Sequence, residues 1–247
     1  MKTKFVMVSK DTSFKMLNAE FEKVDDSSSV SVEYVMNNTD ALAVVYNKFL
    51  REARSSNDVD RLVLMHSDVS FNVQDFIKHL DSIDSKYDVI GLCGTSILNV
   101  SQSPLNWWNG SNPTPYAKWG CVTHGELKDH TSYFSNHSPN VLDHEVSCID
   151  GLCIIFTKTA LDTTLEFDES VGKFDFYDTD ISMQAVMNYK LKLGVMVRMD
   201  LCHYSVGRSI MTSDFLENEI KFRNKWNLPI PSDSAVARHI EMKKQQH

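Results

Sequence analysis

Residues 62–69 have the sequence LVLMHSDV, an apolar run that ends abruptly at an acidic residue, Asp68. A continuous apolar run of this length is typical of a strand that is buried on both faces of a parallel sheet covered by helices. Sheets of that kind bind ligands just beyond the carboxyl ends of their strands. The pattern therefore predicts an α/β fold with Asp68 at the ligand-binding edge, although an Asp at this position can also simply open a turn.

The composition is that of an ordinary globular protein. The 247 residues are 42% hydrophobic and 23% charged, which is enough apolar material for a core. No run of about 18 apolar residues occurs, so we expect no membrane span. The N-terminal residues also lack the apolar segment of a signal peptide. The five cysteines contain no CxxC pair, which argues against a zinc knuckle and favours reduced thiols in the cytoplasm.

The net charge of −8 does not favour a nonspecific nucleic-acid binder, because such proteins normally carry a basic balance. It is compatible with a phosphate-bearing ligand held by a metal ion, since the ion supplies the positive charge.

Strand-like and helix-like segments alternate over the first two-fifths of the chain. The expected helices are residues 39–54 and 73–85, and the expected strands are residues 5–8, 29–36, 62–65 and 89–93. This alternation implies right-handed crossovers and a mostly parallel central sheet flanked by helices. The pattern breaks over residues 95–146, which are rich in turn formers and aromatic residues. A long segment with so little periodicity is usually functional.

Regular structure resumes after this segment. We expect strands over residues 151–157 and 193–198, and helices over residues 181–187 and 215–226. Asn188 is expected in a left-handed conformation at the end of its helix. Because no internal repeat or linker occurs, the sequence predicts one domain over residues 1–230, followed by a polar C-terminal tail over residues 231–247.

Three polar clusters follow expected strands or open expected helices, and a doubly wound sheet can bring them to one edge. They are residues 66–68 (HSD), 177–180 (YDTD) and 203–205 (HYS). A carboxylate and an imidazole can hold one divalent ion with positions left for phosphate oxygens. The ion would act as a Lewis acid on a leaving diphosphate. A second carboxylate could deprotonate an acceptor hydroxyl.

The ordered set of motifs resembles nucleotide-sugar glycosyltransferases of the GT-A fold, and within that fold the family-2-like enzymes. The match covers roughly residues 5–230. It is carried by Tyr46-Asn47 with Ala53, His66-Ser67-Asp68-Val69, Ile149-Asp150-Gly151, Phe176-Tyr177-Asp178-Thr179-Asp180, His203-Tyr204-Ser205 and Lys225-Trp226 through Pro229. Tyr46 and Asn47 also have a purely structural interpretation, since Tyr46 belongs to an apolar helical stripe and Asn47 can tie that helix to a loop.

The resemblance implies a metal site and a base. Asp68 corresponds to the second acid of the Asp-x-Asp element, which holds the metal, and His203 corresponds to the late histidine that completes the site. Asp178 corresponds to the general base of inverting members. His66 departs from the family pattern, because it stands where the first acid of Asp-x-Asp is expected. An imidazole is less typical of magnesium, so we expect Mn²⁺ rather than Mg²⁺.

The resemblance also implies donor-binding positions. Asp150 and Gly151 correspond to the element near the donor sugar, and His66 belongs to the same donor side. Asn37 and Asn38, after the second strand, lie where the family usually holds the nucleoside.

Trp107, Trp108 and Asp180 are the acceptor-side candidates. Indole faces can stack on a sugar or a base, but core packing is an equally good explanation for both tryptophans. Asp180 can equally cap the helix that it is expected to open.

Together these features predict a metal-dependent glycosyltransferase that moves a sugar from a nucleotide-diphosphate donor to an acceptor hydroxyl. Asp178 acting as base predicts inversion of configuration, and retention is the alternative. We expect a glycan or a small molecule as acceptor. Transfer to hydroxymethylated bases of viral DNA is an alternative that would need a basic strip beside the site. A non-catalytic nucleotide-sugar-binding module is another, supported by His66. A nucleotidyltransferase ranks last, because residues 8–16 offer only lysines for phosphates.

Overall fold

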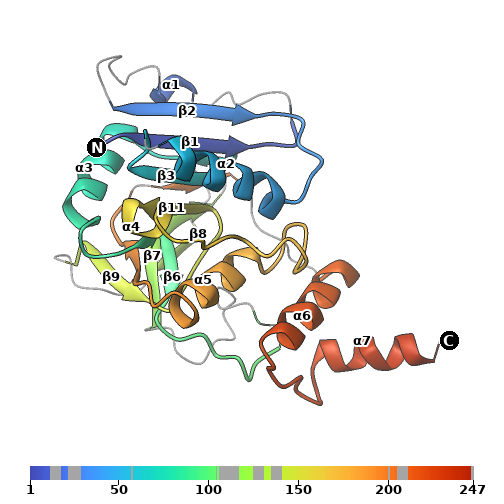
Figure 1. The fold of residues 1–247 in the computed structure, drawn as a ribbon. Coiled ribbons are helices and arrows are strands. Elements are labelled where there is room, and N and C mark those ends of the chain that lie inside the picture. The colour runs from blue at the N-terminus through green and yellow to red at the C-terminus, as the bar shows by residue number, and fades with distance from the viewer. Residues whose placement is uncertain are drawn as a thin grey trace.

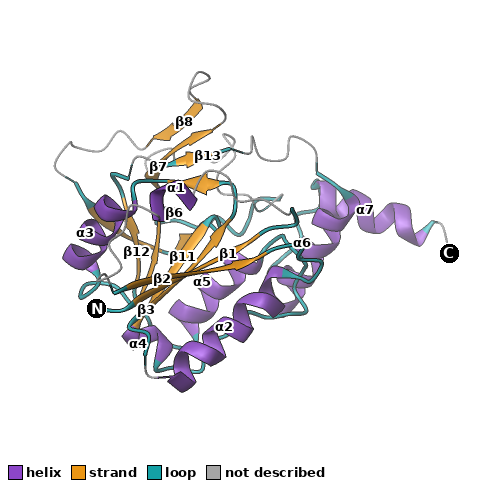
Figure 2. Cartoon of the chain, turned by 90° about the horizontal axis from the view of Figure 1, so that it is seen from above, coloured by secondary structure: helices purple, strands orange, loops and turns teal. Residues whose placement is uncertain are grey.

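A seven-stranded mixed sheet forms the centre of the molecule, and helices cover its two faces (Figures 1 and 2). The computed structural model describes residues 1–11, 18–21, 29–56, 58–103, 105, 117–124, 131–134, 141–199, 201–204 and 211–245. The strand order is β2 (Val30–Val35), β1 (Thr3–Val8), β3 (Arg61–His66), β11 (Cys153–Thr157), β5 (Val89–Gly91), β12 (Leu193–Met196) and β9 (Asp143–Val146).

The expected α/β class is confirmed, but the sheet is mixed rather than mostly parallel. Strand β1 runs parallel to both β2 and β3, and β12 runs parallel to β5. Strand β11 is inserted antiparallel between β3 and β5, and β9 is antiparallel to β12. The apolar pattern of residues 151–157 does not reveal this direction, because a strand buried on both faces looks the same either way.

The two faces of the sheet follow the two-residue period of its strands. Val6 and Leu64 point to the face covered by α2 (Leu42–Ser56), α4 (Lys158–Leu161) and α5 (Tyr177–Met187). Phe5 and Val63 point to the opposite face, which packs against α3 (Val73–Ile83). The sheet is thus buried on both sides, as the apolar run in β3 predicts.

A second, smaller sheet lies beside the central one. It contains β10 (Cys148–Ile149), β6 (Cys93–Thr95), β7 (Lys118–His124), β13 (Cys202–His203) and β4 (Val69–Ser70), with β8 (Thr131–Phe134) paired to β7. The segment expected as one strand over residues 89–93 is divided between the two sheets, since β5 ends at Gly91 and β6 begins at Cys93.

The remaining helices are α1 (Asn18–Phe21), α6 (Ser213–Lys225) and α7 (Ala235–Lys244), and α7 lies within the segment expected as a polar tail. Its Val236 has no exposed surface. Within the described ranges, no helix combines the length and the apolar character needed to cross a membrane.

Helix α5 differs most from the sequence-based expectation. It begins at Tyr177, not at residue 181, and its N-cap is Phe176, which has a φ of 65°. Asp180 therefore lies inside the first turn and is not an N-cap. The predicted left-handed conformation of Asn188 is also wrong, since its φ is −95° and the positive φ of 59° falls at Lys190.

Candidate active site

Three parallel strand ends define the edge where the candidate site lies. Val8 at the end of β1 is aligned with Val35 of β2 and with His66 of β3. The chain after β2 is held at this edge, because the Asn38 N–H donates to the Ser9 carbonyl at 2.8 Å. Asn38 and the exposed Asn37 therefore lie at the same sheet edge as the turn that carries Asp68.

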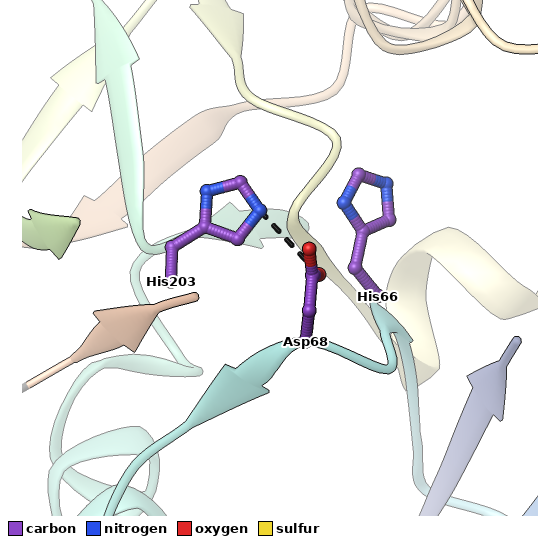
Figure 3. A group of neighbouring side chains, drawn as sticks. All are labelled: His66, Asp68 and His203. Carbon is purple, nitrogen blue, oxygen red and sulfur yellow. Dashed lines mark ion pairs between the residues drawn. The ribbon is translucent and has the colours of Figure 1, made fainter. Parts of the chain in front are cut away.

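His66, Asp68 and His203 form a cluster at this edge (Figure 3). One potential ligand atom from each residue lies within 4.8 Å of the others, and Nε2 of His203 is 3.4 Å from Oδ1 of Asp68. A short antiparallel pairing brings His203 beside Asp68, although the two residues are far apart in the sequence, because His203 of β13 pairs with Val69 of β4. The Tyr204 N–H also donates to the Asp68 carbonyl at 2.8 Å.

Asp68 and His203 each shift the pKa of the other in the direction that favours its charged form. Burial would raise the pKa of Asp68, but the hydrogen bond and charge of His203 outweigh it and lower the pKa. Burial would lower the pKa of His203, but the bond to Asp68 outweighs it and raises the pKa. Burial lowers the pKa of His66, which keeps its ring neutral near pH 7. One carboxylate and two imidazoles make a donor set suited to a divalent first-row transition ion.

A buried carboxyl lies close to the cluster. Asp178, in the first turn of α5, accepts hydrogen bonds from the Gly151 N–H at 3.0 Å and the Thr179 N–H at 2.7 Å. Burial, and then the negative charge of Asp150, raise the pKa of Asp178 to about 7 despite these bonds. A carboxyl with such a pKa can accept a proton at neutral pH, which is the requirement for a general base.

Asp150 and Gly151 form a turn between β10 and β11. The Asp150 carboxylate accepts from the Leu152 N–H at 2.9 Å, and the Asp150 N–H donates to the Cys93 carbonyl at 2.9 Å. Gly151 has no room for a side chain, since a Cβ would collide with the hydroxyl of Tyr177. This turn is why β11 begins at Cys153 rather than at residue 151.

Two aromatic residues complete the site. From the sequence, Tyr177 belongs to a polar cluster without an assigned role, and Phe174 is not singled out. The Tyr177 hydroxyl is 2.7 Å from Nε2 of His66 and donates to the Gly151 carbonyl at 3.0 Å. The ring of Phe174 is stacked on His66 with centroids 5.4 Å apart, and 39% of Phe174 is exposed. Phe174 has no distinctive sequence signal, because aromatic residues before a helix are usually core residues.

A family model described as "Glycosyltransferase like family" matches residues 4–225, which is most of the chain. The chain belongs to this glycosyltransferase family. No curated protein sequence matches it.

Among solved structures, GalNAc-T7 with UDP, GalNAc and Mn²⁺ is similar to this glycosyltransferase. The match covers 91% of the present chain and 48% of the GalNAc-T7 chain, at 10% identity and a TM-score of 0.51. S. aureus TarS 1–349 with UDP-GlcNAc is similar over 93% and 68%, at 13% identity and a TM-score of 0.48. A197 from STIV is similar over 83% and 86%, at 16% identity and a TM-score of 0.48. At such low identity, GalNAc-T7 shows only that the GT-A fold is shared, as the sequence motifs predict.

Asp180, one of the three acceptor-side candidates, is not brought to the site. Asp180 of the glycosyltransferase has no exposed surface. Its carboxylate accepts from Lys225 at 2.8 Å, from the Trp226 indole at 2.8 Å and from Gln184 at 2.7 Å. These contacts direct Asp180 into the interface between α5 and α6. Trp107 and Trp108 lie outside the described residues.

The structural interpretation of the helix motif is confirmed. Asn47 ties α2 to a loop of the glycosyltransferase, since its amide donates to the Phe167 carbonyl at 2.9 Å and accepts from the Phe167 N–H at 2.8 Å. Tyr46 is completely buried in the core.

Proposed function

We propose that this glycosyltransferase transfers a sugar from a nucleoside-diphosphate donor to an acceptor hydroxyl, with inversion at the anomeric carbon. The observation that carries the proposal is the cluster of His66, Asp68 and His203, which shares one end of the sheet with a buried carboxyl of near-neutral pKa. The reaction needs a cation that stabilises the leaving diphosphate and a group that accepts the proton of the acceptor hydroxyl. The metal-ligand cluster and the buried carboxyl can meet these two needs.

The proposed metal is Mn²⁺. His66, Asp68 and His203 would hold it, and a donor set with two imidazoles suits Mn²⁺ better than Mg²⁺, which prefers oxygen ligands. The GalNAc-T7 structure contains both UDP and Mn²⁺, and this supports a similar pair here by analogy of fold. When bound, the ion would stabilise the negative charge that develops on the leaving diphosphate.

The nucleoside is proposed to bind beside Asn37 and Asn38. Asn37 is exposed and has a φ of 53°, and the segment after β2 opens onto the same edge as Asp68. The Phe174 ring is stacked on His66 and is partly exposed, and its exposed part would form an aromatic wall beside the sugar or the acceptor.

Asp178 is the proposed general base. The acceptor oxygen attacks the anomeric carbon, its proton passes to the Asp178 carboxylate, and the bond from that carbon to the diphosphate oxygen breaks with its electron pair. Hydrogen bonds from the backbone of Gly151 and Thr179 hold the carboxylate in one orientation during this transfer. Attack on the face opposite the leaving group inverts the configuration.

The proposed acceptor is a glycan or a small molecule, because the net charge of −8 does not favour DNA. Binding of a hydroxymethylated duplex that weakens steeply with salt would instead favour the DNA alternative. We place the protein in the cytoplasm, where buried thiols such as Cys148 and Cys153 stay reduced.

A thermal-shift panel of nucleotide sugars, each with and without Mn²⁺, tests the proposal. A donor that binds the native state raises the unfolding temperature, and at a given concentration a tighter donor raises it more. We expect a shift that requires Mn²⁺ in the wild type, is lost in Asp68→Ala and is retained in Asp178→Asn. Donor turnover should be lost in Asp68→Ala and should fall by about 10²- to 10⁴-fold in Asp178→Asn. If no donor shifts the wild type, the proposal is wrong, and a shift without hydrolysis or transfer would favour a binding module.

A further inference from the structure

The hydroxyl of Tyr177 lies between the candidate metal ligand His66 and the candidate donor-binding residue Gly151. It is 2.7 Å from Nε2 of His66 and donates to the Gly151 carbonyl at 3.0 Å. The side chain is almost completely buried, so water does not compete for these bonds.

The single hydrogen of the Tyr177 hydroxyl determines the tautomer of His66. A phenol has one hydrogen, and that of Tyr177 goes to the Gly151 carbonyl. The short contact with His66 therefore needs its hydrogen from the imidazole, which makes Nε2 the protonated nitrogen. In the neutral ring, the lone pair is then on Nδ1.

Nδ1 is also the ring nitrogen of His66 that faces the other two residues of the cluster. In Figure 3 the His66 ring nitrogen next to Cγ lies on the side of His203, and the other nitrogen points away from the cluster. Metal-binding histidines usually donate their second N–H to an oxygen, and this contact fixes the ring orientation. Tyr177 supplies that oxygen here.

The same tyrosine requires a glycine at position 151. A Cβ at Gly151 would collide with the Tyr177 hydroxyl, and the Gly151 N–H donates to Asp178, the next residue along α5. One residue thus connects the candidate metal site to the turn that orients the candidate base.

We propose that Tyr177 is a positioning residue that holds His66 with Nε2–H directed to the phenol and Nδ1 directed to the metal ion. This inference rests on the proposed metal site. It assigns His66 to the metal itself, in the place where the family has a carboxylate.

The test is the Mn²⁺ affinity of Tyr177→Phe, measured by electron paramagnetic resonance on the full chain without donor. We expect Mn²⁺ binding about 10- to 100-fold weaker than in the wild type, which is the range typical when a metal ligand loses its hydrogen-bond partner. Tyr46→Phe is the matched control. It removes a hydroxyl in the same core that has no hydrogen-bond partner among the described residues, and it should leave the affinity unchanged.

A double-mutant cycle separates positioning from general damage. If Tyr177 acts through His66, adding Tyr177→Phe to His66→Ala should cost no further affinity. Pulsed spectra should show nitrogen couplings from two imidazoles in the wild type and weaker or altered coupling from one of them in Tyr177→Phe.

The outcomes are distinct. Wild-type protein that binds no Mn²⁺ overturns the metal site and this inference together. Wild-type binding with an unchanged affinity in Tyr177→Phe overturns this inference alone, as does a full additive loss in the His66→Ala background.

Discussion

The Gly151 N–H donates to the Asp178 carboxylate at 3.0 Å, and the neighbouring Tyr177 hydroxyl donates to the Gly151 carbonyl. Two consecutive residues of α5 therefore hold both polar groups of one glycine. These contacts anchor the first turn of α5, which carries the candidate base, to the turn before β11.

Activity should rise with pH through the pKa of Asp178. Since this pKa is raised to about 7, the carboxyl is mostly protonated and inactive as a base at pH 6 and ionised at pH 8. We expect kcat/KM to rise roughly tenfold per pH unit below pH 7. Asp178→Asn should lower kcat by about 10²- to 10⁴-fold.

The charge of Asp150 is the second cause of the raised Asp178 pKa. Asp150→Asn should therefore move the rising limb of the pH profile to lower pH. A pH profile that is flat between 6 and 8 in the wild type would remove Asp178 from the role of base.

Asp180→Ala should destabilise the fold. Removing this unexposed carboxylate leaves the Trp226 indole without its partner in the α5–α6 interface and leaves Lys225 with Asp168 alone. We expect a loss of about 3–5 kcal/mol in the free energy of unfolding, measured with urea. Asp168→Ala is the control, because Asp168 also pairs with Lys225 at 2.7 Å but is partly exposed, and it should cost about 1 kcal/mol. Equal losses would contradict the structural role of Asp180.

Gly151→Ala should be destabilising through its collision with Tyr177. An added methyl group in a packed site costs about 1–3 kcal/mol. The same change should cost less in a Tyr177→Phe background, because the phenol oxygen is the nearest atom to the new methyl group. Urea unfolding of the four proteins gives the coupling energy, and strict additivity would contradict direct contact.

Phe174→Ala should weaken substrate binding. The ring presents an exposed face beside His66, and loss of one stacking contact of about 1.4 kcal/mol raises KM about tenfold. Phe174→Trp should retain binding. Met187→Ala removes a similarly exposed apolar side chain at the far end of α5 and should leave KM unchanged. An unchanged KM in Phe174→Ala would remove the aromatic wall from the proposal.

The local elements could be predicted because their signals lie within short windows. The apolar run before His66 predicts β3, and the helical stripe that includes Tyr46 predicts α2. The start of α5 could not be predicted, since it depends on a positive φ at Phe176 and on backbone bonds from Gly151 and Thr179 to Asp178. The role of Asp180 was also hidden, because its partners Lys225 and Trp226 belong to a different helix.

The sequence by itself determined the α/β class, the family and the identity of Asp68, His203 and Asp178 as chemically notable positions, because periodicity and ordered motifs are properties of the linear chain. Only the tertiary structure decided that His66 joins Asp68 and His203, that Tyr177 contacts His66, and that Asp180 faces inward. These facts depend on which strands pair and in which direction. The two-residue ladder between β13 and β4 closes the cluster, and no local pattern encodes such a long-range pairing.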